Sequence, residues 1–265
     1  MSRYFCGIDI GSSYTKVVVV DENRSIVGHE VRKTGISFDQ VALDALDEIL
    51  AQAKIDRASI GRVVSTGVGR HNCSIRDVAR PEITALAKGS FYLFPRAITI
   101  VDIGGQDNKV IKVGADGRQL SFKMNRKCAA GTGSFLEEVA HKLDLTIAQT
   151  NQQAANAERS INVGSFCTVF AATEIVHHIR NGEKLDQILL GVFESIYKRA
   201  SEMDTITDPV VLTGGAVAHA PVLKDIFQKR GNISVLTPPE PQLVCAMGAA
   251  IFAYEGSQAQ SEEDQ

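Results

Sequence analysis

Short apolar runs separated by glycine turns dominate the start of the chain, and a similar series begins again near residue 97. Period-two and period-3.6 apolar patterns distinguish strands from helices. The first series predicts strands at 4–10, 15–21, 25–32 and 62–66, and helices at 38–54 and 80–89. The second series predicts strands at 97–103, 107–113, 119–124, 210–213 and 233–236, and helices at 133–144, 167–181, 184–203, 220–230 and 243–255.

One short motif occurs twice in this pattern. Asp9-Ile10-Gly11-Ser12 runs on to Lys16, and Asp102-Ile103-Gly104-Gly105 runs on to Lys109. Each copy is an apolar strand that ends in an aspartate, a glycine turn and a second apolar strand. Turn N–H groups suit phosphate oxygens, and a carboxylate beside them suits the accompanying cation. Two copies therefore predict two related halves that bind one nucleotide from both sides, as in an ATPase.

The order of elements resembles that of the actin-like (RNase H-like) ATPase fold, an α/β class, because three strands precede alternating helices and strands in both series. We expect a first lobe at 1–95, a second lobe at 96–255 and a disordered polar tail at 256–265. The sequence has no Gly-x-x-x-x-Gly-Lys-[Ser/Thr] motif, which excludes a P-loop mechanism.

Composition narrows the class of protein further. The chain has 265 residues, of which 44% are hydrophobic, and this suffices for two lobes with sizeable cores. A formal net charge of −3 gives no reason to expect nucleic acid or a membrane as partner. The chain lacks a signal-peptide pattern, and its five cysteines show no paired spacing. We therefore expect a cytoplasmic protein with reduced thiols.

The two hairpins and a later glycine pair supply the candidate nucleotide site. Asp9 and Asp102 are expected to hold Mg²⁺ through water. Gln106 is the first candidate for orienting the attacking water and Asp107 the second, and ordinary turn polarity is the alternative for both. Lys16 either adds a charge near phosphate or faces outward from its strand. The remaining predicted contacts to ATP or ADP are Gly11, Ser12, Ser13, Gly104 and Gly105 at the phosphates and Gly214, Gly215 and Gln242 at the nucleoside.

Cys128 and Cys167 are the candidate metal-binding residues. Cys128 precedes a predicted helix in which Ser134 and Glu137 form a capping-box pattern, and Cys167 opens another. Helix N-termini favour thiolates, which are the ligands of iron–sulfur clusters. Burial in a core remains the alternative for both thiols. One chain offers two of the four sulfurs that a [4Fe–4S] cluster needs, and a two-fold dimer would supply the other two.

Several motifs together resemble one known family. They are Asp9-Ile10-Gly11-Ser12, Ile103-Gly104-Gly105-Gln106-Asp107, Lys127-Cys128-Ala129-Ala130-Gly131-Thr132-Gly133, Cys167-Thr168-Val169-Phe170-Ala171 and Thr213-Gly214-Gly215. The chain is similar, except in its last ten or so residues, to the ATP-dependent activators of 2-hydroxyacyl-CoA dehydratases. The same family includes the ATPase subunits of benzoyl-CoA reductases and the reductases that serve double-cubane cluster proteins.

The resemblance implies a homodimer with one [4Fe–4S] cluster that Cys128 and Cys167 of both chains ligate. It further implies an ATPase coupled to electron transfer. A ferredoxin or flavodoxin would donate an electron, and a dehydratase, an aromatic-ring reductase or a double-cubane protein would receive it. Two positions depart from the family pattern, which usually has an acidic residue at Ala172 and an aromatic residue at Val68.

Two other functions fit the same scaffold. A sugar or small-molecule kinase would need a carboxylate base aimed at a substrate hydroxyl, and no aspartate lies in a convincing loop for that role. A non-catalytic switch of the actin or chaperone kind would bind nucleotide without iron.

Overall fold

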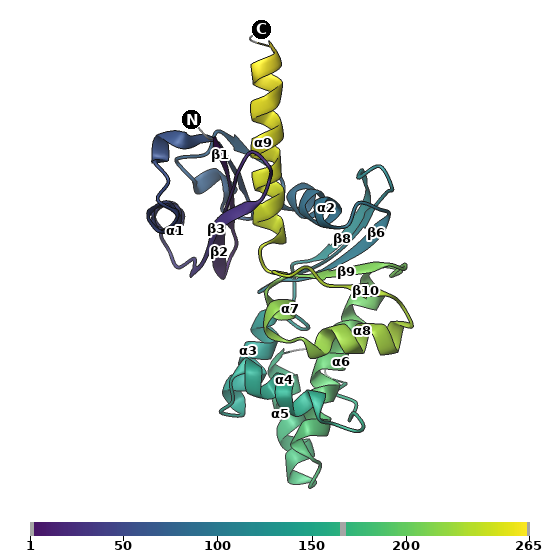
Figure 1. Cartoon of the computed structure of the whole chain (residues 1–265). Coiled ribbons are helices and arrows are strands. Elements are labelled where there is room, and N and C mark those ends of the chain that lie inside the picture. The colour runs from purple at the N-terminus through teal and green to yellow at the C-terminus, as the bar shows by residue number, and fades with distance from the viewer. Residues whose placement is uncertain (1–2, 165–167, 264–265) are drawn as a thin grey trace. The chain divides into compact units, whose positions relative to one another are not determined.

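The computed structural model describes residues 3–164 and 168–263, which form two compact units (Figure 1). The first unit runs from the N-terminus to Arg96 and also contains Val113–Gln119 and the chain from Gln242 onward. The second unit contains Ala97–Lys112 and Leu120–Pro241.

The two sheets share one topology, which confirms the duplication expected from the sequence. The strand order is β3-β2-β1-β4-β5 in one sheet and β8-β7-β6-β9-β10 in the other. In both, the strand that carries the motif aspartate is central and pairs in parallel with a later strand, β4 or β9. A central strand that ends in a turn places the aspartate at the edge of the sheet where the next parallel strand also ends.

The first unit packs helices on both faces of its sheet. Helix α1 and one face of the sheet enclose a core that includes Ile8, Val17 and Leu46, and α9 covers the other face with Ala246, Ala249 and Ala253. The elements are β1 (Tyr4–Ile10), β2 (Tyr14–Val20), β3 (Ile26–Lys33), α1 (Phe38–Ala53), β4 (Ile60–Thr66), β5 (Val78–Ala79), α2 (Glu82–Leu93) and α9 (Val244–Glu263), with short 3-10 turns at Arg57–Ser59 and Arg70–Asn72.

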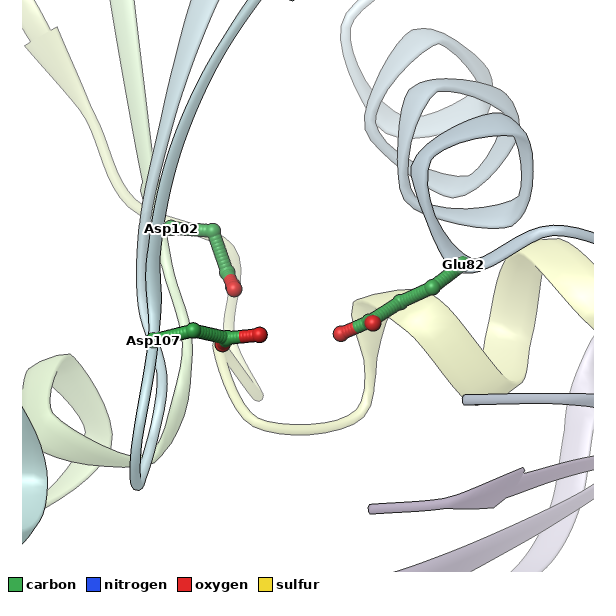
Figure 2. Close-up of side chains that lie close together, drawn as sticks. All are labelled: Glu82, Asp102 and Asp107. Carbon is green, nitrogen blue, oxygen red and sulfur yellow. The ribbon is translucent and has the colours of Figure 1, made fainter. Parts of the chain in front are cut away.

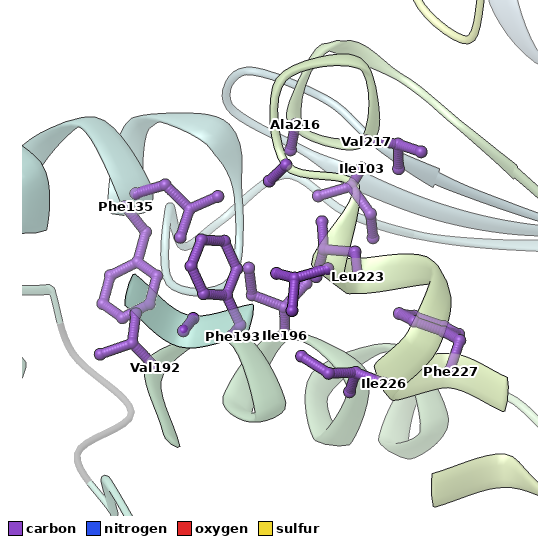
Figure 3. Packing of buried hydrophobic residues seen from close by; sticks show 14 of the residues in the cluster. Ile103, Phe135, Val192, Phe193, Ile196, Ala216, Val217, Leu223, Ile226 and Phe227 are labelled. Carbon is purple, nitrogen blue, oxygen red and sulfur yellow. The ribbon is translucent and has the colours of Figure 1, made fainter. Parts of the chain in front are cut away.

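The second unit encloses a larger core, in which the end of β6 packs among helices (Figure 3). Ile103, next to the motif aspartate, shares this core with Phe135 of α3 and Phe193 of α6. The elements are β6 (Ile98–Ile103), β7 (Asn108–Val113), β8 (Gln119–Asn125), α3 (Gly133–Lys142), α4 (Ile147–Ala155), α5 (Thr168–Arg180), α6 (Leu185–Met203), β9 (Val210–Thr213), α7 (Gly215–His219), α8 (Val222–Gly231) and β10 (Val235–Leu236).

Several segments differ from the sequence expectations, and one is the two-residue strand β5, which was not predicted. Helix α4 was not predicted, although Thr146 and Gln149 form a complete capping box at its start. The short α7 was not predicted either. Helix α9 continues to Glu263, through residues that polar composition assigned to a disordered tail. Alanine and glutamine are good helix formers, and Arg62 donates a hydrogen bond of 2.8 Å to Gly256 O within this extension.

Among the helices that the structure describes, none combines the length and apolar character needed to cross a bilayer.

Helices α2 and α9 approach each other closely through glycine. A Cβ atom on Gly248 of α9 would overlap the backbone oxygen of Ala85 and lie 2.8 Å from Gly89 N, both in α2. Backbone atoms cannot move aside as a flexible side chain can. This contact therefore requires glycine at position 248.

We predict that Gly248→Ala lowers the free energy of unfolding by about 1–3 kcal/mol, the usual cost of overpacking. Gly256→Ala in the same helix is the matched control, because its nearest neighbours belong to the flexible Arg62 side chain, 3.1–3.3 Å away. The control is expected to stay within about 1 kcal/mol of wild type. Chemical denaturation measures both. Equal effects of the two substitutions would contradict the packing argument.

Candidate functional site

The second copy of the motif forms a turn between β6 and β7. Gly104 N donates to Asp107 O at 2.9 Å, which closes the turn directly after Asp102 and Ile103. Asp102 lies beside Thr213 of β9 in the parallel register. Figure 2 shows Asp102 and Asp107 extending to the same side of this hairpin. The turn thus brings two carboxylates together at the sheet edge.

Lys109 lies between these two carboxylates and is only 1% exposed. Its Nζ is 3.1 Å from Asp102 Oδ2 and 2.6 Å from Asp107 Oδ1. The other oxygen of Asp102, Oδ1, accepts a hydrogen bond of 2.8 Å from Thr213 Oγ1. Both oxygens of Asp102 are therefore engaged within the protein.

The first copy of the motif has the same outline but a different set of contacts. Gly11 N donates to Tyr14 O at 3.1 Å, and Lys16 Nζ lies 2.9 Å from Asp9 Oδ2. Asp9 and Lys16 are directly opposite each other in the β1–β2 register. Asp9 is 4% exposed, and its Oδ1 has no hydrogen-bond partner among the described residues. This buried oxygen can accept a hydrogen bond from a metal-bound water.

A Thr-Gly pair at the end of the neighbouring strand is a further part of the repeat that sequence reasoning missed. Thr66 ends β4 and Gly67 follows it, just as Thr213 ends β9 and Gly214 follows it. Both glycines have positive φ, +85° and +102°. A Cβ on Gly67 would overlap Ile10 O, and one on Gly214 would overlap Ile103 O. Comparing the two strand ends in the sequence would have revealed this second duplication.

The threonines of these pairs differ in what they contact. Thr213 Oγ1 donates to Asp102, whereas Thr66 Oγ1 is buried and has no hydrogen-bond partner in the described part of the chain. Thr66 is the register partner of Asp9, whose Oδ1 is in the same state. Two unsatisfied buried oxygens at one strand end indicate a site that gains contacts when water or a ligand binds.

The predicted nucleotide contacts fall into two groups. Asp9, Lys16 and the turn Gly11–Ser13 lie together in the first unit, as does Gln242. Asp102, the turn Gly104–Asp107 and the pair Gly214-Gly215 lie in the second unit. Ser12 and Gln106 are the exposed members of their turns.

Cys128 lies in the loop 126–132 between β8 and α3 and is half-buried. The Nδ2 atom of Asn125 donates to Cys128 O at 3.4 Å. Cys167, the other predicted ligand, lies outside the described residues, and helix α5 begins with the next residue, Thr168.

The start of α3 differs from the expected capping box. Its N-cap is Thr132, and no side chain in the described residues caps it, so Ser134 and Glu137 do not form that motif. Instead, Gly133 N donates to Gly104 O and Ser134 N donates to Gly105 O, each at 2.8 Å. The helix amides are thus used by the β6–β7 turn. The expected capping box at Ser134 and Glu137 is therefore wrong.

Three other thiols belong to the first unit. Cys6 and Cys73 are fully buried. Burial raises the pKa of the Cys6 thiol far above its usual value, and the neighbouring Cys73 raises it further. Burial also raises the pKa of Cys73. Cys245 is buried and directs its sulfur at Glu82 O, 3.7 Å away. Raised pKa values disfavour the thiolate that a metal needs, so Cys6 and Cys73 fit a structural role.

Comparison with known proteins agrees with the duplicated hairpins. The BadF/BadG/BcrA/BcrD ATPase family matches residues 6–253. The chain belongs to this ATPase family. The family resemblance noted from the motifs is thereby confirmed.

Members of known role cover nearly the whole chain. The chain is 39% identical over 260 residues to the activator of lactoyl-CoA dehydratase from Anaerotignum propionicum, covering 96% of this chain and 99% of that protein. A solved structure of the activator of the 2-hydroxyisocaproyl-CoA dehydratase from Clostridium difficile with bound ADPNP has a TM-score of 0.91 at 34% identity, covering 98% of this chain and 97% of that one.

A more distant structure shows the fold alone. MreB 5 of Spiroplasma citri bound to AMPPNP has a TM-score of 0.56 at 13% identity, covering 99% of each chain. This member of the BadF/BadG/BcrA/BcrD family thus has the actin-like ATPase fold that the order of elements predicted.

We predict that Lys109→Met lowers the free energy of unfolding by about 3–5 kcal/mol, because it leaves the Asp102 and Asp107 carboxylates without their cation. Lys112→Met is the matched control on the same strand. Its partner Asp204 is 3.5 Å away in a more exposed ion pair, so the expected loss is below about 1 kcal/mol. Urea titration compares the two variants. Similar losses in the two variants would show that burial of the ion pairs at Lys109 adds nothing to their contribution to stability.

Proposed function

We propose that this chain is an ATP-dependent reductive activator, which couples ATP hydrolysis to transfer of one electron to a partner iron–sulfur enzyme. The relative from Anaerotignum propionicum, which is an activator of lactoyl-CoA dehydratase, supports this assignment. The assignment also accounts for a loop that carries a cysteine in a protein whose two repeated hairpins fit a nucleotide.

The observation that carries the proposal is a set of hydrogen bonds between the segment that follows Cys128 and the β6–β7 hairpin, which we assign to the nucleotide. The turn Gly104–Gly105, which we assign to phosphate, accepts two hydrogen bonds from the first amides of α3. Cys128 lies in the loop immediately before this helix. If nucleotide binding displaces the turn, these backbone hydrogen bonds of 2.8 Å would therefore transmit the displacement to the loop that carries Cys128.

Asp9 is the better of the two aspartates for Mg²⁺. Both oxygens of Asp102 are engaged by Lys109 and Thr213, whereas the Oδ1 atom of Asp9 is buried without a partner among the described residues. Mg²⁺ usually keeps several waters and contacts one or two carboxylates. Asp9 would therefore hold the hydrated ion, and Asp102 would chiefly fix the position of its hairpin.

The donor set fits an iron–sulfur cluster. Cys128 is half-buried on a loop, and Cys6 and Cys73 have pKa values raised by burial. Cys128 and Cys167 of two chains would supply four thiolates, which is the number that a [4Fe–4S] cluster requires. A bound cluster of this type supplies one-electron transfer at a potential that its protein surroundings set.

Helix α5 supports the homodimer. Val176 and Ile179, three residues apart on one face of this helix, are 50% and 42% exposed, and Phe170 near its start is 67% exposed. Neighbouring exposed apolar side chains on one helix face are a candidate contact for another chain. Because α5 follows Cys167 directly, a two-fold contact along it would bring the cysteines of both chains together.

ATP hydrolysis and electron transfer would involve different residues of the protein. Gln106, the exposed side chain of its turn, would orient the attacking water, with Asp107 held beside it by Lys109. ATP and water become ADP and phosphate. One electron enters from a ferredoxin or flavodoxin, and one leaves to a 2-hydroxyacyl-CoA dehydratase, a benzoyl-CoA reductase or a double-cubane cluster protein.

We predict that protein purified without oxygen is a coloured dimer with about two iron atoms per chain, one four-iron cluster for each pair. Cys128→Ala and Cys167→Ala should each remove the iron and the visible absorption, because each substitution removes two of the four ligands of the dimer. Iron analysis and the visible spectrum measure this outcome.

Cys73→Ala is the control, since that thiol is buried in the first unit. A colourless Cys73 variant would overturn the ligand assignment. Iron-free wild-type protein that phosphorylates a sugar would instead favour a kinase on this scaffold.

We predict that Asp9→Asn keeps the iron but slows ATP turnover by about 100-fold or more, because the charge that faces the metal-bound phosphate is lost. Glu22→Gln, an exposed change in the β2–β3 turn, is the control and should keep wild-type turnover. Steady-state phosphate release measures both. Normal turnover in the Asp9 variant would exclude it from the metal site.

A further inference from the structure

Asn108 is a buried polar residue that the mechanism above does not use. It begins β7, between Asp107 and Lys109, and is 1% exposed. Its Nδ2 donates a hydrogen bond of 2.9 Å to Gly131 O. Its Oδ1 is buried and, within the described chain, lacks a hydrogen-bond partner. Burying an amide with only part of its capacity satisfied costs free energy, so packing alone does not explain this residue.

The acceptor of this bond lies in the cysteine loop, residues 126–132. Gly131 is three positions after Cys128 and has a φ of +80°. Inside the loop, Thr132 bonds back to Ala129 O through both N and Oγ1. The segment 129–132 is thus a compact turn, and Asn108 of β7 donates a hydrogen bond to it at Gly131.

The donor side of the bond belongs to the nucleotide hairpin. The residues on both sides of Asn108 form the 2.6 Å ion pair between Asp107 and Lys109. Asp107 also closes the turn through its backbone oxygen, which accepts from Gly104 N. Any rearrangement of that ion pair or turn when Mg²⁺ and ATP bind will shift the backbone at position 108.

We propose that Asn108 is a positioning residue that transmits nucleotide binding to the Cys128 segment through Gly131. The inference rests on the proposed function and adds a side-chain connection to the two backbone bonds at the start of α3. Asn108 is not among the residues assigned to the nucleotide, and its side chain bonds to Gly131 rather than to Cys128. Its loss should therefore uncouple residues 126–132 from the nucleotide while leaving nucleotide affinity nearly unchanged, and the two backbone bonds at residues 133 and 134 should persist.

Asn125 provides a matched control within the same loop. Its Nδ2 donates to Cys128 O at 3.4 Å, so it too is an amide that holds the cysteine loop. It lies at the end of β8 rather than on the β6–β7 hairpin. Removing it should loosen the loop in every nucleotide state without affecting the response to nucleotide.

Hydrogen–deuterium exchange of the full-length protein, as purified, tests the proposal on peptides covering 126–132. The probe is Mg²⁺ with a non-hydrolysable ATP analogue. In wild type the analogue should change the exchange rate by about fivefold, the factor expected for one hydrogen bond. In Asn108→Leu the ratio of the exchange rates with and without the analogue should fall below about twofold. The affinity for the analogue should stay within about threefold of wild type.

Asn125→Leu should exchange faster with and without the analogue and keep the wild-type ratio. If Asn108→Leu does not fold, Asn108→Ser serves instead, because its side chain is too short to reach Gly131 O. A wild-type ratio in a folded Asn108 variant, or a wild-type protein that binds the analogue without any change in this loop, would overturn the proposal.

The two levels of inference can fail separately. Iron-free protein that still shows an Asn108-dependent ratio would overturn the proposed electron transfer and support the connection. Iron-containing protein whose ratio ignores Asn108 would retain the proposed function and overturn the connection.

Discussion

The pairing of each strand-end aspartate with a lysine on the following strand is the interaction on which both hairpins depend. An ionised carboxylate that is nearly buried loses hydration worth several kcal/mol unless a cation compensates it. Asp9 faces Lys16 across the β1–β2 register, and Lys109 lies 3.1 Å from Asp102. With these pairs in place, the central strand of each sheet can end in a buried charge at the point where the glycine turn begins.

The two copies have diverged in what surrounds this pair. In the second unit Thr213 and Asp107 add contacts, so that Asp102 and Lys109 form a closed network. In the first unit the corresponding Thr66 and the Oδ1 of Asp9 are buried with no partner in the residues described. A closed network favours a fixed geometry, whereas unsatisfied oxygens favour a ligand. The duplication has therefore produced one hairpin whose buried oxygens are open to a ligand and one whose contacts hold its turn in place.

The sequence was sufficient for the features that repeat and insufficient for those that depend on tertiary contacts. Apolar periodicity and the doubled Asp-Ile-Gly motif predicted the described strands except β5, and they predicted the fold. The sequence pattern predicts a capping box at Ser134 and Glu137, but the first amides of α3 bond to the β6–β7 turn instead. The capping box that the structure contains is at Thr146 and Gln149, at the start of a helix with few apolar residues. The Asn108–Gly131 bond joins residues far apart in the chain, and no local pattern indicates it.

The missing cap of α3 has a physical consequence for how the protein works. The first amides of any helix need acceptors from outside the helix. A capping side chain would satisfy one of these amides within the helix itself, and α3 would then depend less on the β6–β7 turn. Because Gly104 O and Gly105 O serve as the acceptors instead, the start of α3 is stable only while the turn keeps its shape. The same two peptide groups that lie at the predicted phosphate site therefore also determine where the cysteine segment begins its helix.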